Sequence, residues 1–90
     1  MTDATRAQIR SFIVENFLFG DDDRLPGDDM SLIDNDVVDS TGVLELVAFL
    51  EERFGIAVAD ADIVPANLDS VGRIAAYVAR MSPVERRLAG

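Results

Sequence analysis

Hydroxyl and carboxylate side chains are the main groups in this chain that could take part in covalent or acid–base chemistry. The 90 residues include no cysteine, histidine or lysine, and all eight basic residues are arginines. The chain therefore cannot form a Ser-His pair, a Cys-His pair or a Schiff-base lysine, and disulfides and thiolate metal sites are excluded. We expect the chain not to be an enzyme and to have no catalytic residues of its own.

Ser40 has the most distinctive setting among the hydroxyl side chains, because it follows Asp39 at the expected start of a strongly amphipathic helix. First-turn amides lack intrahelical partners and carry partial positive charge, so an anion on the Ser40 oxygen would be favoured by up to about 1 kcal/mol. A simpler interpretation is that Ser40 only caps the helix, which contributes about 1 kcal/mol. A second Asp-Ser pair, Asp69-Ser70, also precedes an expected helix but lacks the long acidic loop before it.

The segment from Val37 to Phe54 resembles the attachment segment of acyl carrier proteins and peptidyl carrier domains. In that family the serine carries a 4′-phosphopantetheine arm, and the thiol of the arm holds acyl or aminoacyl cargo as a thioester. The resemblance spans roughly Ile9 to Met81 and includes the phrases at 54–58 and 67–78. It implies that Ser40 is the attachment site for an arm derived from coenzyme A, and that a phosphopantetheinyl transferase and its metal activate the hydroxyl.

Two positions depart from the family pattern. Thr41 follows the serine where most relatives have leucine, which shortens the apolar contact beside the arm. Asp36 stands in the loop where many relatives have glycine, so a differently shaped turn before Ser40 is expected. Neither departure removes the hydroxyl.

The resemblance also implies that the outer face of the same helix recognises partner enzymes. Its recognition residues would be Asp39, Thr41, Leu44, Glu45, Ala48, Glu51 and Glu52. The alternative is that these residues are only the solvated side of an amphipathic helix. The formal net charge of −9 repels nucleic acid and anionic membranes and favours proteins with basic patches.

Helical periodicity predicts an all-α fold, a small four-helix bundle of three longer helices and one short helix. The expected helices cover 3–19, 40–54, 60–64 and 69–81, and a long loop covers 21–39. The first should be capped by Thr2 or Asp3 and stopped at Gly20, the second stopped at Gly55, the third ended before Pro65, and the fourth capped by Asn67 or Asp69. The expected core residues are Ile9, Phe12, Ile13, Phe17, Val43, Leu46, Val47, Leu50, Phe54, Val71, Ile74, Ala75 and Val78, and the expected loop anchors are Leu32, Ile33, Val37 and Val38.

Two further expectations concern the loop and the C-terminus. The aspartates of the loop do not follow the EF-hand ligand spacing, because Val38 or Leu25 falls on a ligand position, so no metal site is expected. The pair Ser82-Pro83 should end the last helix, giving a carrier domain over 1–81 and a frayed tail over 82–90.

The sequence thus indicates a discrete, monomeric and cytoplasmic acyl carrier protein. It would shuttle thioester-bound intermediates between loading and processing enzymes in fatty-acid, polyketide or related biosynthesis. An aminoacyl or peptidyl carrier of a nonribosomal-peptide-type pathway is the nearest alternative. An unmodified acidic helical adaptor, which docks on a basic partner, is the alternative from another class.

Overall fold

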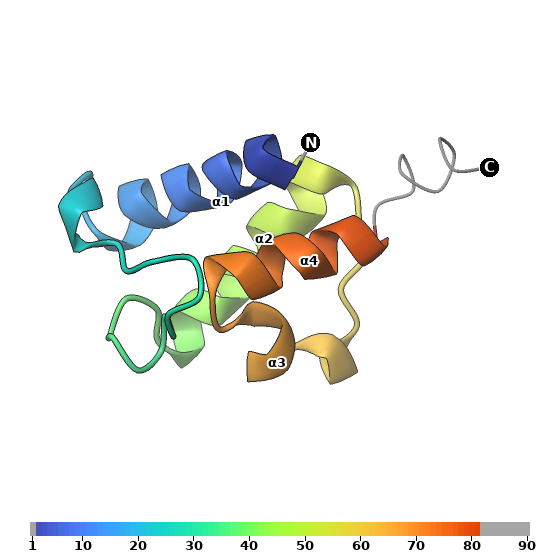
Figure 1. Cartoon of the computed structure of the whole chain (residues 1–90). Coiled ribbons are helices and arrows are strands. Elements are labelled where there is room, and N and C mark those ends of the chain that lie inside the picture. Colours follow the sequence, from blue (N-terminus) through green and yellow to red (C-terminus); the bar gives the residue numbers. More distant parts are fainter. Residues whose placement is uncertain (1, 82–90) are drawn as a thin grey trace.

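The computed structural model describes residues 2–81, and within this range the chain is helical, with four α-helices and no strand (Figure 1). The prediction of a small helical bundle is therefore confirmed. The expected break at Ser82-Pro83 and the expected tail lie outside the described residues. The elements are α1 (Thr2–Phe17), the 3-10 helix η1 (Asp22–Arg24), α2 (Ser40–Phe54), the 3-10 helix η2 (Asp60–Asp62), α3 (Pro65–Leu68) and α4 (Val71–Met81).

Helix α1 ends earlier than expected, and the set of residues that it buries differs partly from the predicted one. It already includes Thr2 and Asp3, so neither residue stands before the first turn as the extended cap that the sequence suggested. Ile9 and Ile13 are fully buried, as expected. Val14 of the helix and Leu18 just after it are also in the core, whereas the expected core residues Phe12 and Phe17 are only partly buried.

Gly20 provides the predicted stop after α1. Its φ of +85° lies in the left-handed region that glycine adopts without strain, and its amide donates to the Val14 carbonyl oxygen at 2.9 Å. The chain then turns into η1, where the Asp21 side chain accepts from the Asp23 amide.

Apolar side chains anchor the long loop at three of the four expected positions. Leu32, Val37 and Val38 are buried, but Ile33 is 43% exposed, so its assignment as a buried anchor is wrong. Hydrogen bonds from the Val37 and Val38 amides to the Leu32 carbonyl oxygen fold this part of the loop back on itself. Leu32 thereby takes the interior position, and Ile33 next to it is left at the surface.

Polar contacts of Asp28 hold the first half of the loop against two helices. The Asp28 carboxylate accepts hydrogen bonds from the Arg10 guanidinium, with Nε at 2.8 Å, and from Arg6 Nη1 at 3.3 Å. Its backbone oxygen accepts from the Gly72 amide of α4 at 2.8 Å. A Cβ atom on Gly72 would lie 3.2 Å from that oxygen, so the close approach of loop and helix favours glycine there.

Helix α2 has the bounds and the buried face that the sequence predicted. Leu46, Val47 and Leu50 are buried, and Val43 and Phe54 pack against the core from partly buried positions. Gly55 ends the helix with a φ of +67°, and its amide donates to the Glu51 carbonyl oxygen at 3.1 Å.

The region between α2 and α4 differs from the expectation in its boundaries. Only Asp60–Asp62 forms a 3-10 turn, and Pro65 begins α3 instead of following a helix. Proline suits this first position because its missing N–H would have no intrahelical partner there. Helix α4 begins at Val71, and its cap is Ser70, whose Oγ accepts from the Arg73 amide at 3.1 Å, rather than Asn67 or Asp69.

Helix α4 packs against both α1 and α3, and its predicted core residues are all buried. Tyr77 is an additional core residue, only 2% exposed, whose hydroxyl donates to Asp62 Oδ2 at 3.0 Å. The bond joins α4 to η2 and so holds the chain that leads into α3.

Candidate functional site

Asp39, not Ser40, caps helix α2. The Asp39 backbone is extended (φ −100°, ψ −177°), its Oδ1 accepts from the Gly42 amide at 2.7 Å, and its carbonyl oxygen accepts from the Val43 amide at 3.0 Å. Ser40 is the first residue of the helix and is exposed. Within residues 2–81 no hydrogen bond involves its hydroxyl, so the interpretation of Ser40 as the cap is wrong and the hydroxyl is open to a reagent.

The start of α2 is electropositive at the backbone. The Asp39 carboxylate accepts a hydrogen bond from the Gly42 amide, while the Ser40 and Thr41 amides have no protein partner in the described part of the chain. Unpaired amides and the helix dipole together favour negative charge at this end. A phosphodiester on the Ser40 oxygen would therefore lie in a favourable field.

Gly42 allows the end of α1 to pack on this first turn. The residue is buried, and a Cβ atom added to it would lie 2.8 Å from Phe17 Cε1 and 3.2 Å from Asp39 Oδ1. A larger residue would have to displace the ring or the cap. Gly42 thus permits the close packing of Phe17 against the helix end that carries Ser40.

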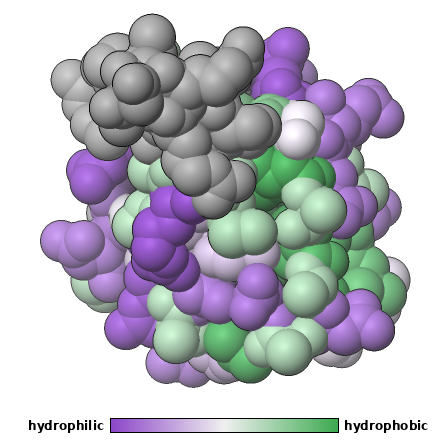
Figure 2. All heavy atoms as spheres, turned by 90° about the vertical axis from the view of Figure 1, so that its right-hand side faces the viewer, coloured by the Kyte–Doolittle hydropathy of each residue, from purple (hydrophilic) through white to green (hydrophobic). Residues whose placement is uncertain are grey.

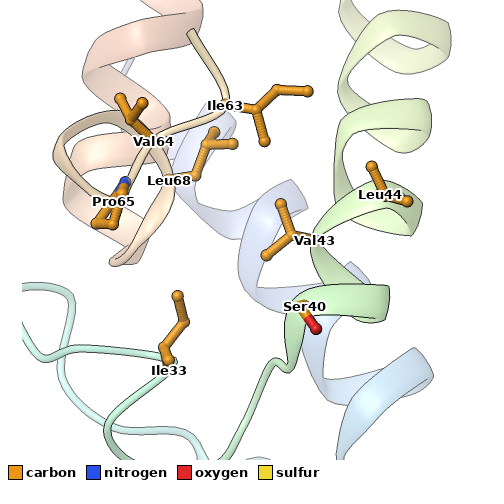
Figure 3. A pocket seen from close by; sticks show the side chains of 8 residues that line it. All are labelled: Ile33, Ser40, Val43, Leu44, Ile63, Val64, Pro65 and Leu68. Atoms are coloured by element: carbon orange, nitrogen blue, oxygen red, sulfur yellow. The ribbon is translucent and has the colours of Figure 1, made fainter. Parts of the chain in front are cut away.

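An apolar groove of about 300 Å³ lies beside Ser40 (Figure 3). Its walls come from three parts of the chain: the loop, the first turns of α2, and the segment from η2 through α3. Apart from Ser40, all the lining side chains are apolar. They are Ile33, Val43, Leu44, Ile63, Val64, Pro65 and Leu68.

Most of these lining residues were not identified from the sequence as part of a site. Ile63 and Val64 were placed in an expected helix over 60–64 that ended before Pro65, so the short apolar run 63–65 was not recognised as part of a site. Ile33 was expected to be a buried anchor of the loop but forms the loop-side wall of the groove instead. Leu44 was expected at the surface, and it is 62% exposed.

The seven expected recognition residues are all exposed, and six of them lie at three- and four-residue spacing along one side of α2. Two of the acidic side chains are already used within the fold. Asp39 caps the helix, and Glu51 Oε2 accepts from the Val58 amide at 2.9 Å. Glu45 and Glu52 make no hydrogen bond or ion pair with the other described residues, so they are the free carboxylates of this face.

Comparisons of the chain with protein-family models, with curated proteins and with solved structures gave no match. None of the helices described here is long and apolar enough to cross a membrane. Figure 2 shows apolar side chains gathered on part of one face and bordered by hydrophilic ones. The arrangement around Ser40 is suited to holding a covalently attached group, with an anionic link at the helix end and an apolar portion in the groove.

Proposed function

We propose that this chain is a discrete acyl carrier protein that bears a 4′-phosphopantetheine arm on Ser40 and passes thioester-bound acyl intermediates between partner enzymes. The observation that carries the proposal is the position of Ser40: an exposed, unbonded hydroxyl on the first residue of α2, at an apolar groove. The long loop followed by a helix whose first residue is a serine supports it.

The residues present fit the arm chemically. The unpaired Ser40 and Thr41 amides suit a phosphodiester, and the apolar groove suits a cargo or the apolar part of an arm. When attached, the arm would supply the thiol that holds cargo as a thioester. The chain itself presents the hydroxyl and orients it; deprotonation of Ser40 would be the task of a transferase and its metal, because the chain has no histidine, cysteine or lysine.

The lining of the groove favours an acyl over an aminoacyl cargo. An aminoacyl thioester carries an ammonium group, which would need a carboxylate or carbonyl partner when removed from water. Among the groove residues Ser40 has the only polar side chain. We therefore prefer the acyl carrier to the aminoacyl or peptidyl carrier, with fatty-acid, polyketide or related biosynthesis as the setting.

Intact-mass spectrometry with coenzyme A and a broad-specificity phosphopantetheinyl transferase tests the attachment. We expect a mass gain of one phosphopantetheine on the wild-type chain and none on Ser40→Ala. Ser70→Ala is the matched control, because Ser70 also follows an aspartate but is 3% exposed and caps α4. No gain under conditions that modify a known carrier would favour the unmodified acidic adaptor, and a gain on Ser40→Ala would place the arm elsewhere.

A further inference from the structure

Asp69 lies between α3 and α4 and binds three consecutive residues of the long loop. Its Oδ2 accepts from Ser31 Oγ at 2.7 Å and its Oδ1 accepts from the Ile33 amide at 3.0 Å. Its backbone oxygen accepts from the Leu32 amide at 2.7 Å. Both carboxylate oxygens are thus committed to one short stretch that lies 36 to 38 residues earlier in the sequence.

The stretch bound by Asp69 is itself tightly bonded and leads directly to Ser40. The Ser31 hydroxyl accepts from the Asp34 amide at 2.9 Å, and the Ser31 carbonyl oxygen accepts from Asn35 Nδ2 at 2.7 Å. The Leu32 carbonyl oxygen accepts from the amides of Val37 and Val38, which directly precede Asp39. A hydrogen-bonded unit over 31–38 is therefore attached to the α3–α4 junction through Asp69.

This attachment joins two walls of the groove. Ile33 forms the loop-side wall and its amide donates to Asp69 Oδ1, while Leu68, directly before Asp69, lines the α3 side (Figure 3). Ile33 is 43% exposed and is not part of the buried core. Its carbonyl oxygen accepts from the Asp36 amide at 3.0 Å within the loop, and the Asp69 carboxylate is the polar contact that ties Ile33 to the α3–α4 junction.

We propose that Asp69 is a positioning residue that sets the width of the groove beside Ser40 by holding Ile33 opposite Leu68. The inference deepens the proposed function and rests on it for its biological meaning: the carboxylate determines how well an aliphatic cargo is shielded from water. The geometric part concerns the unmodified chain and is testable without an arm.

The first experiment measures the geometric part on the unmodified protein. In Asp69→Ala, the Ile33 amide should exchange with solvent at least about tenfold faster than in the wild type, the factor expected for loss of one charge-assisted hydrogen bond. The amide of buried Leu46 reports global unfolding, so the Ile33 effect must exceed any change at Leu46. In Asp69→Asn, which retains one acceptor oxygen, the exchange rate of the Ile33 amide should lie between those of the wild type and Asp69→Ala. Asp60→Ala makes the same charge change at an exposed site outside this network.

The second measurement is the affinity of a neutral apolar dye, N-phenyl-1-naphthylamine, for the groove. A neutral probe is needed because Asp69→Ala also changes the net charge. Binding should weaken severalfold in Asp69→Ala, stay unchanged in Asp60→Ala, and be lost in Val64→Asp, which places a charge in the lining. Unchanged Ile33 exchange or unchanged dye affinity in Asp69→Ala overturns the inference.

The third measurement uses protein loaded from octanoyl-coenzyme A. Hydroxylamine should cleave the octanoyl thioester severalfold faster in Asp69→Ala than in the wild type, while the rate of loading stays within about twofold, because Ser40 itself is unaltered. Loading with equal cleavage rates rejects the role of Asp69 in shielding but leaves the carrier assignment intact. A wild-type chain that accepts no arm rejects the carrier assignment, and the exchange and dye results then decide the geometric inference alone.

Discussion

Asp39 and Ser40 are adjacent but have separate tasks at the start of α2. The Asp39 carboxylate satisfies the Gly42 amide, whereas the Ser40 hydroxyl makes no bond within the described residues. Asp39→Ala should therefore lower the free energy of unfolding by about 1 kcal/mol, the usual effect of losing an N-cap. Ser40→Ala should change it by less than about 0.5 kcal/mol, as at an exposed surface position. Urea denaturation of the two variants measures both values.

The same pair separates stability from loading. Ser40→Ala should be as stable as the wild type and carry no phosphopantetheine, whereas Asp39→Ala should be less stable but still able to accept it. A loss of stability in Ser40→Ala as large as that in Asp39→Ala would mean that the serine, and not the aspartate, caps the helix.

At this scale the sequence predicted a special role for Ser40, which stays a prediction, and did not predict which of its neighbours caps the helix. Asp, Ser and Thr can all cap a helix, and three such residues in a row leave the cap undecided until the backbone angles are known. Asp36 in the loop before Ser40 has a φ of +59°, the left-handed conformation that glycine adopts freely and that aspartate tolerates better than most residues. The backbone at position 36 is therefore one that glycine would also adopt.

The rotation of helix α2 about its axis is tested by three leucines. Leu46 and Leu50 are fully buried, and Leu44 is 62% exposed. Leu46→Ala and Leu50→Ala should each lower the free energy of unfolding by roughly 2–5 kcal/mol, because each leaves a cavity in the core. Leu44→Ala should lower it by less than about 1 kcal/mol. Denaturant midpoints decide the matter, and equal losses at all three positions would contradict the observed helix face.

Helix boundaries could be predicted where a regular apolar period ends at a clear stop residue. Helix α2 has an uninterrupted apolar period and a glycine at its end, and its bounds matched. The region around Pro65 did not, because proline can follow one helix or begin the next with equally little penalty. The α4 cap was missed because Asn67, Asp69 and Ser70 are all good caps, and Asp69 is occupied by contacts with the distant loop.

The groove could not be predicted from the pattern of apolar residues. Its lining comes from three segments, and only their arrangement in space brings Ile33, Val43 and Val64 around one cavity. Within each segment these residues look like ordinary core positions. Ile33 is 43% exposed and its amide donates to Asp69 Oδ1, a contact with a residue 36 positions later that no local sequence signal reports.

Across the whole molecule, Asp28 links α1, the loop and α4, and this link makes stability depend on acid. The hydrogen bond from Arg10, together with the positive charges of Arg10 and Arg6, holds the pKa of Asp28 below its ordinary value of 3.8 against the opposing effect of burial. A carboxyl with a lowered pKa in the folded state stabilises the fold above pH 3.8, and this contribution is lost as the pH falls through the folded-state pKa.

The variant Asp28→Asn tests this link. At pH 7 its free energy of unfolding should be about 1 kcal/mol lower than that of the wild type. The effect is small because the arginines are partly exposed. The difference should shrink as the pH falls below 3.8 and vanish once Asp28 is protonated in the folded state. Urea unfolding from pH 7 to pH 2 measures it, with Asp60→Asn as the charge-matched control. A difference that stayed constant down to pH 2 would rule out the ion pairs as its source.

The net charge of −9 could guide partners to the molecule as a whole or to one face of it. Glu45 and Glu52 are the free carboxylates on the Ser40 side of α2, so reversing either to arginine should slow loading by a transferase without unfolding the domain. The loss should lie mainly in association rate and should shrink with added salt, because the screening length is only about 8 Å at physiological ionic strength.

Asp60→Arg is the control, since it makes the same charge change on η2. Asp62 is unsuitable because it accepts from Tyr77. Transferase kinetics across a salt series separate the two cases: slower loading for the α2 variants alone supports a docking face, whereas equal slowing for Asp60→Arg shows that total charge alone is acting.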